Sequence, residues 1–295
     1  MRIRSVESAL AAGLSLVVAV ALAQTADWNP IVPRPLEEAQ LFLENQYEKP
    51  VTYEDPVWRW IGDSVAVGSQ TDGPFGRLLW DRHLDLPDGV TAQENRKLDA
   101  RLVQRVVDEY HRQNPGDTRF KVVESSLGLH ILPAYVHDEN GTLVEASSLL
   151  DTKITVPSAA RMPSEHFRAI CEAITNASGT RVDFGGQWLD QFLAPNGAVP
   201  RYGAETLLTA KEKEPYSFQW AASGVPAREA LIGLIESSST TLTWALLCRP
   251  SLKPQDRFCV LNLGPIQVTR ADSDGKLVKK SLSYDRCGKC EFLKR

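Results

Sequence analysis

The side chains best suited to acid–base chemistry lie in two small groups far apart in the sequence. His83 stands between Asp81 and Asp85, where an acid–base pair for hydrolysis could form. His130 and His137 bracket an expected strand and offer a second such pair, or two metal ligands. A spacing of seven puts the two histidines on opposite faces of a strand, so we interpret His137 as part of a polar turn.

No recognised catalytic motif gathers these side chains. The sequence has neither G-x-S-x-G nor H-E-x-x-H, and it lacks the glycine-rich loops that hold phosphates or dinucleotides. We therefore expect no catalytic residue, cofactor or metal, with a hydrolase of envelope polymers as the alternative. On this interpretation, alanine at His83, His130 or His137 should leave function and stability nearly unchanged.

Two tryptophans suggest a third kind of function. Trp58 and Trp60 alternate, so on a strand they would share one face and could stack on a sugar ring. Packing in a core or an interface is the commoner use of such a pair. A carbohydrate-binding protein is therefore a second alternative.

The five cysteines fall into three groups. Cys171 lies on an apolar helix face with Ile170 and Ile174, so we expect it to be buried and unreactive. Its nearest histidine, His166, stands five residues earlier, which is a poor position for a base on the same helix face.

Cys248 and Cys259 are predicted to form a disulfide across two strands. The apolar residues that alternate onto one face are Trp244, Leu246 and Cys248 on the first strand and Cys259, Leu261 and Leu263 on the second. Pairing the two cysteines keeps that whole face apolar. Directly opposed Cα atoms are about 4.5–5.5 Å apart, which is within disulfide range.

The third group, Cys287 and Cys290, forms a C-x-x-C close to the last residue. A redox motif needs a helix N-terminus beside the thiol, and a zinc site needs a second pair of ligands. Neither is present at the right spacing, so we interpret the pair as a local disulfide.

The first residues predict export. Arg2 and Arg4 precede an apolar run that ends in Ala21-Leu22-Ala23, a pattern that signal peptidases accept. The run has about 15 residues against the ~20 that span a bilayer. We expect a signal peptide over residues 1–23 in a periplasmic or secreted bacterial protein with no later membrane span. An uncleaved anchor is the alternative.

The composition is that of an ordinary globular protein. Among 295 residues, 33 are Lys or Arg, 37 are Asp or Glu, and 43% are hydrophobic. This balance excludes wholesale disorder and gives no electrostatic reason to bind nucleic acid or an anionic membrane. The partner that we expect is another envelope protein.

Apolar spacing predicts the elements of the first domain, residues 36–150, which follows a proline-rich arm over residues 24–35. Helices are expected over residues 36–47 and 91–113, the first with Glu37 and Glu38 placed to suit the helix dipole. Thr91 and Glu94 form a capping-box pattern for the second helix. Four strands are expected, over residues 50–53, 120–125, 129–136 and 143–147.

The second domain, residues 151–270, contains an approximate internal repeat of strand, helix and strand before a tail over residues 271–295. Pro163 and Pro226 open the two helices, and matched apolar positions such as Ile170 and Leu234 are about 63 residues apart. Coincidence between two ordinary units is the alternative.

The second unit carries a family resemblance. Its segments are Tyr216-Ser217-Phe218-Gln219-Trp220, Val225-Pro226-Ala227-Arg228-Glu229-Ala230-Leu231 and Leu242-Thr243-Trp244. They resemble the short N-terminal module of secretins and TonB-dependent receptors over about 50 residues, except that Ser237-Ser238-Ser239 replaces the usual turn glycine. The resemblance implies β-α-β units used for protein–protein contact in the periplasm. The N-terminal half resembles exported bacterial proteins of no assigned activity.

Together these patterns predict an α+β fold, with helices packed on small mixed sheets in two lobes that meet near residue 150. We expect an exported, non-catalytic module that contacts another protein through strand edges or a sheet face.

Overall fold

The structure, a computed structural model, describes residues 34–57, 65–66, 78–79, 82–88, 90, 97–138, 140–185, 217–236, 242–249, 257–271 and 275–281. The chain divides into two units. In one of them β2 (Val65–Ala66) pairs antiparallel with β3 (Leu78–Leu79). All the other described elements belong to the second unit, to which the following paragraphs refer.

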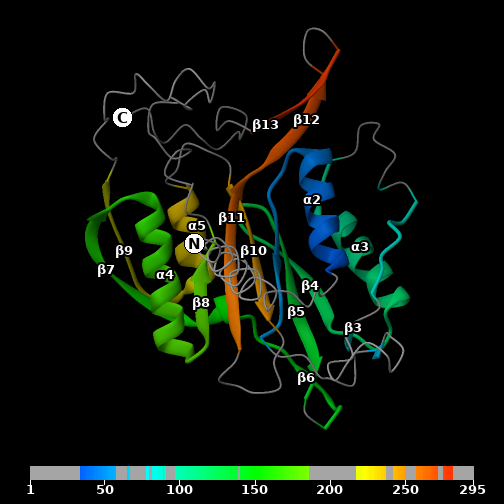
Figure 1. Cartoon of the computed structure of the whole chain (residues 1–295), viewed down its shortest axis with the longest axis horizontal. Helices are drawn as coiled ribbons and strands as arrows, with labels where there is room; N and C mark the ends of the chain where they lie inside the picture. Colours follow the sequence, from blue (N-terminus) through cyan, green and yellow to red (C-terminus); the bar gives the residue numbers. More distant parts are fainter. Residues whose placement is uncertain are drawn as a thin grey trace, which may run out of the picture. The chain divides into compact units, whose positions relative to one another are not determined.

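A seven-stranded sheet forms the centre of the second unit (Figure 1). Its strands, in spatial order, are β4 (Arg119–Glu124), β5 (Leu129–His137), β1 (Val51–Glu54), β10 (Leu242–Arg249), β11 (Phe258–Pro265) and β8 (Arg181–Phe184), with β6 (Leu143–Glu145) beside β5. β1 runs parallel to both of its neighbours, β5 and β10. β11 is antiparallel to β10 and parallel to β8.

Strands from both sides of residue 150 share this sheet. β1 from the N-terminal half pairs with β10 from the C-terminal half, with Tyr53 opposite Ala245. The α+β class is as predicted, but one sheet joins residues 36–150 and 151–270 in place of two lobes with small sheets. The reason lies in β1, whose four residues are all buried, because a parallel strand covered on both faces needs a neighbour at each edge.

Helices cover both faces of the sheet. α2 (Pro35–Tyr47) and α3 (Ala100–Gln113) pack on one face, against Val51, Tyr53 and Ile131. α4 (Pro163–Ser178) and α5 (Ala227–Glu236) pack on the other face, against Trp244 and Leu246. The first core takes its sheet residues mainly from β1, β4 and β5, and the second takes them from β8, β10 and β11.

A separate two-stranded ribbon covers α4 and α5 (Figure 1). It consists of β7 (Lys153–Arg161) and β9 (Phe218–Pro226), which run antiparallel. Ile154 and Val156 of β7 are buried in the same core as α4 and α5, while Thr155 between them is exposed. The ribbon therefore buries one face and exposes the other.

The two units of the repeat have the predicted order, β7-α4-β8 and β9-α5-β10. In each unit the first strand lies in the ribbon and the second lies in the main sheet. β7 is antiparallel to β9, and the pairings of β11 make β8 antiparallel to β10 as well. The two copies therefore run in opposite directions around their shared core.

One predicted helix starts later than expected. The pattern predicts a helix from Thr91, but α3 begins at Ala100, where the Asp99 side chain accepts a hydrogen bond from the Leu102 amide at 2.8 Å. Asp99 is therefore the N-cap of α3. Thr91 and Glu94 lie outside the described residues.

The last described strands form a hairpin, β12 (Gln267–Ala271) with β13 (Leu277–Ser281). The expected boundary between residues 270 and 271 therefore falls inside a strand. No helix in the described segments is long and apolar enough to cross a membrane.

The predicted register of β10 and β11 is confirmed. Cys248 lies opposite Cys259, and Trp244 lies opposite Leu263. The two sulfur atoms are 2.05 Å apart in a disulfide, with Cα atoms separated by 4.0 Å. Other predicted features lie outside the described residues, namely the signal peptide over residues 1–23, Trp58, Trp60, Asp81, Cys287 and Cys290.

Candidate functional site

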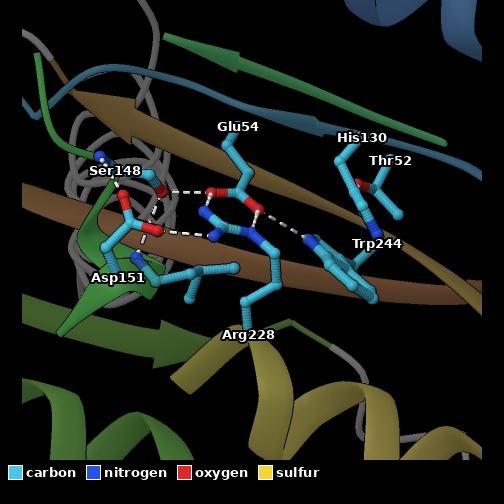
Figure 2. Close-up of polar contacts among 8 residues, drawn as sticks. Thr52, Glu54, His130, Ser148, Asp151, Arg228 and Trp244 are labelled. Atoms are coloured by element: carbon cyan, nitrogen blue, oxygen red, sulfur yellow. Dashed lines mark hydrogen bonds and ion pairs between the residues drawn. The ribbon is translucent and has the colours of Figure 1, made fainter. Parts of the chain in front are cut away.

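His130 lies at the centre of a buried polar group on the face of the sheet that α4 and α5 cover. Its Nδ1 is 2.8 Å from Thr52 Oγ1, and its Nε2 is 2.6 Å from Ser125 Oγ. Figure 2 shows the imidazole beside Trp244, and the two rings stack with centroids 5.3 Å apart. Three neighbouring strands, β1, β5 and β10, therefore hold His130 in place.

Ser125, His130 and Thr52 have the connectivity of a nucleophile, a base and an orienting group. The Leu127 amide donates to Ser125 Oγ at 3.1 Å, which leaves the Ser125 hydroxyl hydrogen for His130 Nε2. The electrostatics oppose catalysis, however. Burial, and then the charge of Arg228, lower the pKa of His130 to about 4. Thr52 stands where a catalytic triad has a carboxylate to stabilise the imidazolium, so His130 is a weak base.

The other predicted histidines do not join this group. His137 is the last residue of β5 and is half-buried. It stands an odd number of residues after His130, so the two side chains point to opposite faces of the strand. His83 and Asp85 are exposed, and the His83 backbone carbonyl accepts a hydrogen bond from Asn114 at 2.8 Å. His137 therefore does not join the group around His130, and Asp81, the expected partner of His83, lies outside the described residues.

Glu54, at the end of β1, is fully buried and forms a bidentate ion pair with Arg228 in the first turn of α5 (Figure 2). Arg228 Nε and Nη2 lie 2.9 and 2.7 Å from the two carboxylate oxygens. The Ser148 hydroxyl also donates to Glu54, and Arg228 Nη1 lies 2.5 Å from Asp151. Trp244 Nε1 donates to Glu54 at 3.4 Å. The carboxylate is thus surrounded by donors.

The Arg228 guanidinium of this ion pair stays ionised inside the protein. Burial alone would lower the pKa of Arg228, but the hydrogen bonds and charges of Glu54 and Asp151 raise it above its ordinary value. The sequence analysis assigned no role to either residue, because they are 174 residues apart. The one local signal is that an acidic residue, Glu54, ends a short segment that was expected to be a strand.

A cleft lies beneath α2, on the opposite face of the sheet from His130 and Trp244. Its volume is about 390 Å³, within the usual range of small-molecule sites. Glu37, Gln40 and Glu44 line it from one face of α2, at the i, i+3 and i+7 positions. Its floor consists of small or polar residues of β10 and β11: Thr243, Ala245, Asn262 and Gly264.

The two carboxyl groups of the cleft hold protons more tightly than exposed carboxyls do. Burial raises the pKa of Glu44 to about 8, although hydrogen bonds from Thr243, Val51 and Gln40 act to lower it. Burial also raises the pKa of Glu37 to about 7, against the opposing charge of Arg34. Perturbed carboxyl groups in a cleft mark a candidate functional site. The sequence analysis related Glu37 only to the helix dipole, because nothing local shows that β10 and β11 cover it.

Cys171 is buried, as predicted, with 1% of its surface exposed. Burial is the main cause that raises the pKa of its thiol to about 12, which removes the thiolate that a nucleophile needs. His166 contacts β9 instead, with Nε2 2.8 Å from the Phe218 carbonyl oxygen. Both side chains therefore belong to the packing of α4.

Comparison with protein families, curated proteins and solved structures finds no match for this chain. The candidate sites must therefore be judged from their own geometry.

Proposed function

We propose that the chain is an exported, non-catalytic protein that works by contact with another protein, which adds a strand to the outer edge of β9. The observation that carries this proposal is the β7–β9 ribbon. Among the described strands, β7 and β9 pair only with each other, so each has one edge without a neighbouring strand. Such an edge presents main-chain donors and acceptors that a partner strand can use.

Of the two edges, β9 is the better acceptor. β7 has Pro157 at its middle and a register shift between Val156 and Ala159, and proline cannot donate to a ladder. β9 has no proline before its last residue, and its exposed side chains Gln219 and Ala221 are uncharged. Charged or proline residues are the usual means of blocking an edge, and this segment has neither.

Two further points support contact as the mode of action. β9 is the first strand of the segment that resembles the secretin and TonB-receptor module, in which such units serve protein–protein contact. The buried His130 is held neutral with no carboxylate behind it, which disfavours the hydrolase alternative.

The test places a lysine at the centre of the β9 edge. Ala221→Lys should strongly reduce capture of a cross-linked partner from the cell envelope, because an edge lysine opposes strand addition. Ala160→Lys is the matched control, since Ala160 is an equally exposed alanine on the other strand of the ribbon. Thermal unfolding of both variants checks that the ribbon still folds. Equal capture by the two variants would show that β9 is not the contact edge.

A hydrolase is kept as the second candidate because Ser125 and His130 lie within hydrogen-bond distance. Purified protein and Ser125→Ala should hydrolyse a nitrophenyl ester at the same background rate. A rate that disappears with Ser125→Ala would replace the contact proposal with an enzyme.

A further inference from the structure

The cleft beneath α2 contains a buried hydrogen-bond acceptor without a donor. Gln40 is 1% exposed, and its Oε1 has no hydrogen-bond partner among the residues that the structure describes. Its Nε2 lies 3.5 Å from Thr243 Oγ1, whose hydroxyl donates to the Val51 carbonyl at 2.7 Å. An unmet buried acceptor is destabilising, so a ligand that supplies a donor here relieves that cost.

Glu37 adds a carboxyl group one helical turn before Gln40, on the same face of α2. The charged groups that act on Glu37 are Arg34, Asp55 and Glu38. Arg34 Nε is 2.8 Å from Asp55 Oδ2, so its guanidinium is engaged by another carboxylate. The lining contributed by β10 and β11 contains no ionisable side chain. The described residues that line the cleft are therefore rich in acceptors and include no cationic group.

The rest of the lining is apolar or small. Leu41, Ala245 and Pro265 lie around the acceptors. A ligand that matches both parts has a cationic head with several donors and a short apolar stem. An ammonium group has three donors and no acceptor, so it can serve Gln40 and Glu37 together.

We infer that the cleft beneath α2 binds a primary ammonium group on a short apolar chain, held between the Glu37 carboxylate and Gln40 Oε1. Two sources carry this chemistry: a free alkyl amine and the lysine side chain of a peptide. This site is independent of the β9 edge, so either proposal can fail without the other.

Binding should depend on pH because the ammonium group needs Glu37 ionised. With a pKa of about 7, Glu37 is ionised in about a tenth of free molecules at pH 6 and about nine tenths at pH 8. The affinity should therefore rise about tenfold between these pH values. Near pH 7, binding should release a fraction of a proton to the buffer.

The experiment is calorimetric titration of the mature chain with 1,5-diaminopentane and, separately, with Nα-acetyl-lysine amide. The affinity for at least one of the two amines should rise about tenfold from pH 6 to pH 8. Binding of both points to a peptide lysine, and binding of the diamine alone points to a free amine. Glu37→Gln should weaken binding and remove the pH dependence between pH 6 and 7, where Glu44, with a pKa of about 8, stays protonated. Glu38→Gln is the matched control, because Glu38 is the exposed neighbour. Its charge helps to raise the pKa of Glu37, so its removal should move the pH dependence slightly to lower pH and leave binding at pH 8 unchanged.

A second variant protects the test against a folding defect in Glu37→Gln. Gln40→Met removes the acceptor at similar length, and it should weaken binding while the pH dependence persists. Three results would overturn the inference: dissociation constants above about 10 mM for both amines at pH 8, equal binding of 1-pentanol, or equal loss with Glu38→Gln.

Discussion

Burial favours the neutral form of an ionisable side chain, and hydrogen-bond or ion-pair partners oppose this effect. His130, Glu44 and Cys171 are buried without an opposite charge, and burial moves the pKa of each towards its neutral form. Glu54 is equally buried, but Arg228 and Ser148 surround it with donors. The same sheet therefore contains buried ionisable groups with an ion-pair partner and others without one.

The structure changes the expectation for His130→Ala. His130 is fully buried, stacked on Trp244 and hydrogen-bonded to Thr52 and Ser125, so its removal leaves a cavity and unpaired hydroxyls. We expect a loss of about 2–4 kcal/mol in the free energy of unfolding, measured with urea. The exposed His83→Ala should change it by less than about 0.5 kcal/mol. Equal losses would show that the His130 contacts are not formed.

Glu44 should make stability depend on pH. Between pH 4.5 and about 8 the folded chain keeps the Glu44 proton while the unfolded chain loses it. The unfolded state then binds fewer protons, so stability falls as pH rises, by at most about 1.4 kcal/mol per pH unit. Glu37, with a pKa of about 7, adds a slope of the same sign at lower pH. Glu44→Gln should therefore flatten the curve most between pH 7 and 8, and urea unfolding at pH 5, 7 and 8 measures this change. If the exposed Glu38→Gln flattened the curve equally, the slope would not belong to Glu44.

Among the elements, those with a strong apolar period were predictable and their ends were not. α2 and α4 follow the periodicity closely, because a helix that covers a core needs that spacing. The sequence segment that marked β9 ended at Trp220. The residues that follow, Ala221-Ala222-Ser223-Gly224, have little strand propensity, and pairing with β7 extends the strand through them. Tertiary pairing is invisible to a local pattern.

The start of α3 offers a test at the same scale. Asp99→Ala removes the N-cap acceptor of the Leu102 amide and should cost about 1 kcal/mol of unfolding free energy. Asp108→Ala, on the exposed side of the same helix, should cost less than about 0.5 kcal/mol. Circular dichroism during urea unfolding follows both. A neutral result for Asp99→Ala would place the start of the helix elsewhere.

In the molecule as a whole, the contacts that the sequence could not reveal are those between its two halves. The strands of each half were readable locally, but nothing local shows that β1 inserts between β5 and β10. The Glu54–Arg228 pair and the α2 cleft both depend on that insertion, because each combines N-terminal with C-terminal residues. The disulfide was predictable because its two cysteines are only 11 residues apart, on strands that are consecutive in sequence.

The junction of the two halves should depend strongly on Arg228. Arg228→Met leaves the Glu54 carboxylate buried without its cation, which typically costs about 3–5 kcal/mol. The double variant Glu54→Gln with Arg228→Met should recover part of that loss, since no lone charge remains. A urea series on wild type, both single variants and the double variant measures the coupling. Additive effects would mean that the two side chains do not interact.

The central position of β1 has a consequence for biosynthesis. The strand leaves the ribosome early, yet one of its edges stays open until residues 242–249 have been made. Such a long sequence separation slows folding and prolongs the exposure of an unpaired strand edge. A polypeptide that stops before residue 242 cannot complete the sheet, so proteases should remove it. Because β10 is made late, the chain can reach its folded state only after synthesis has passed residue 249.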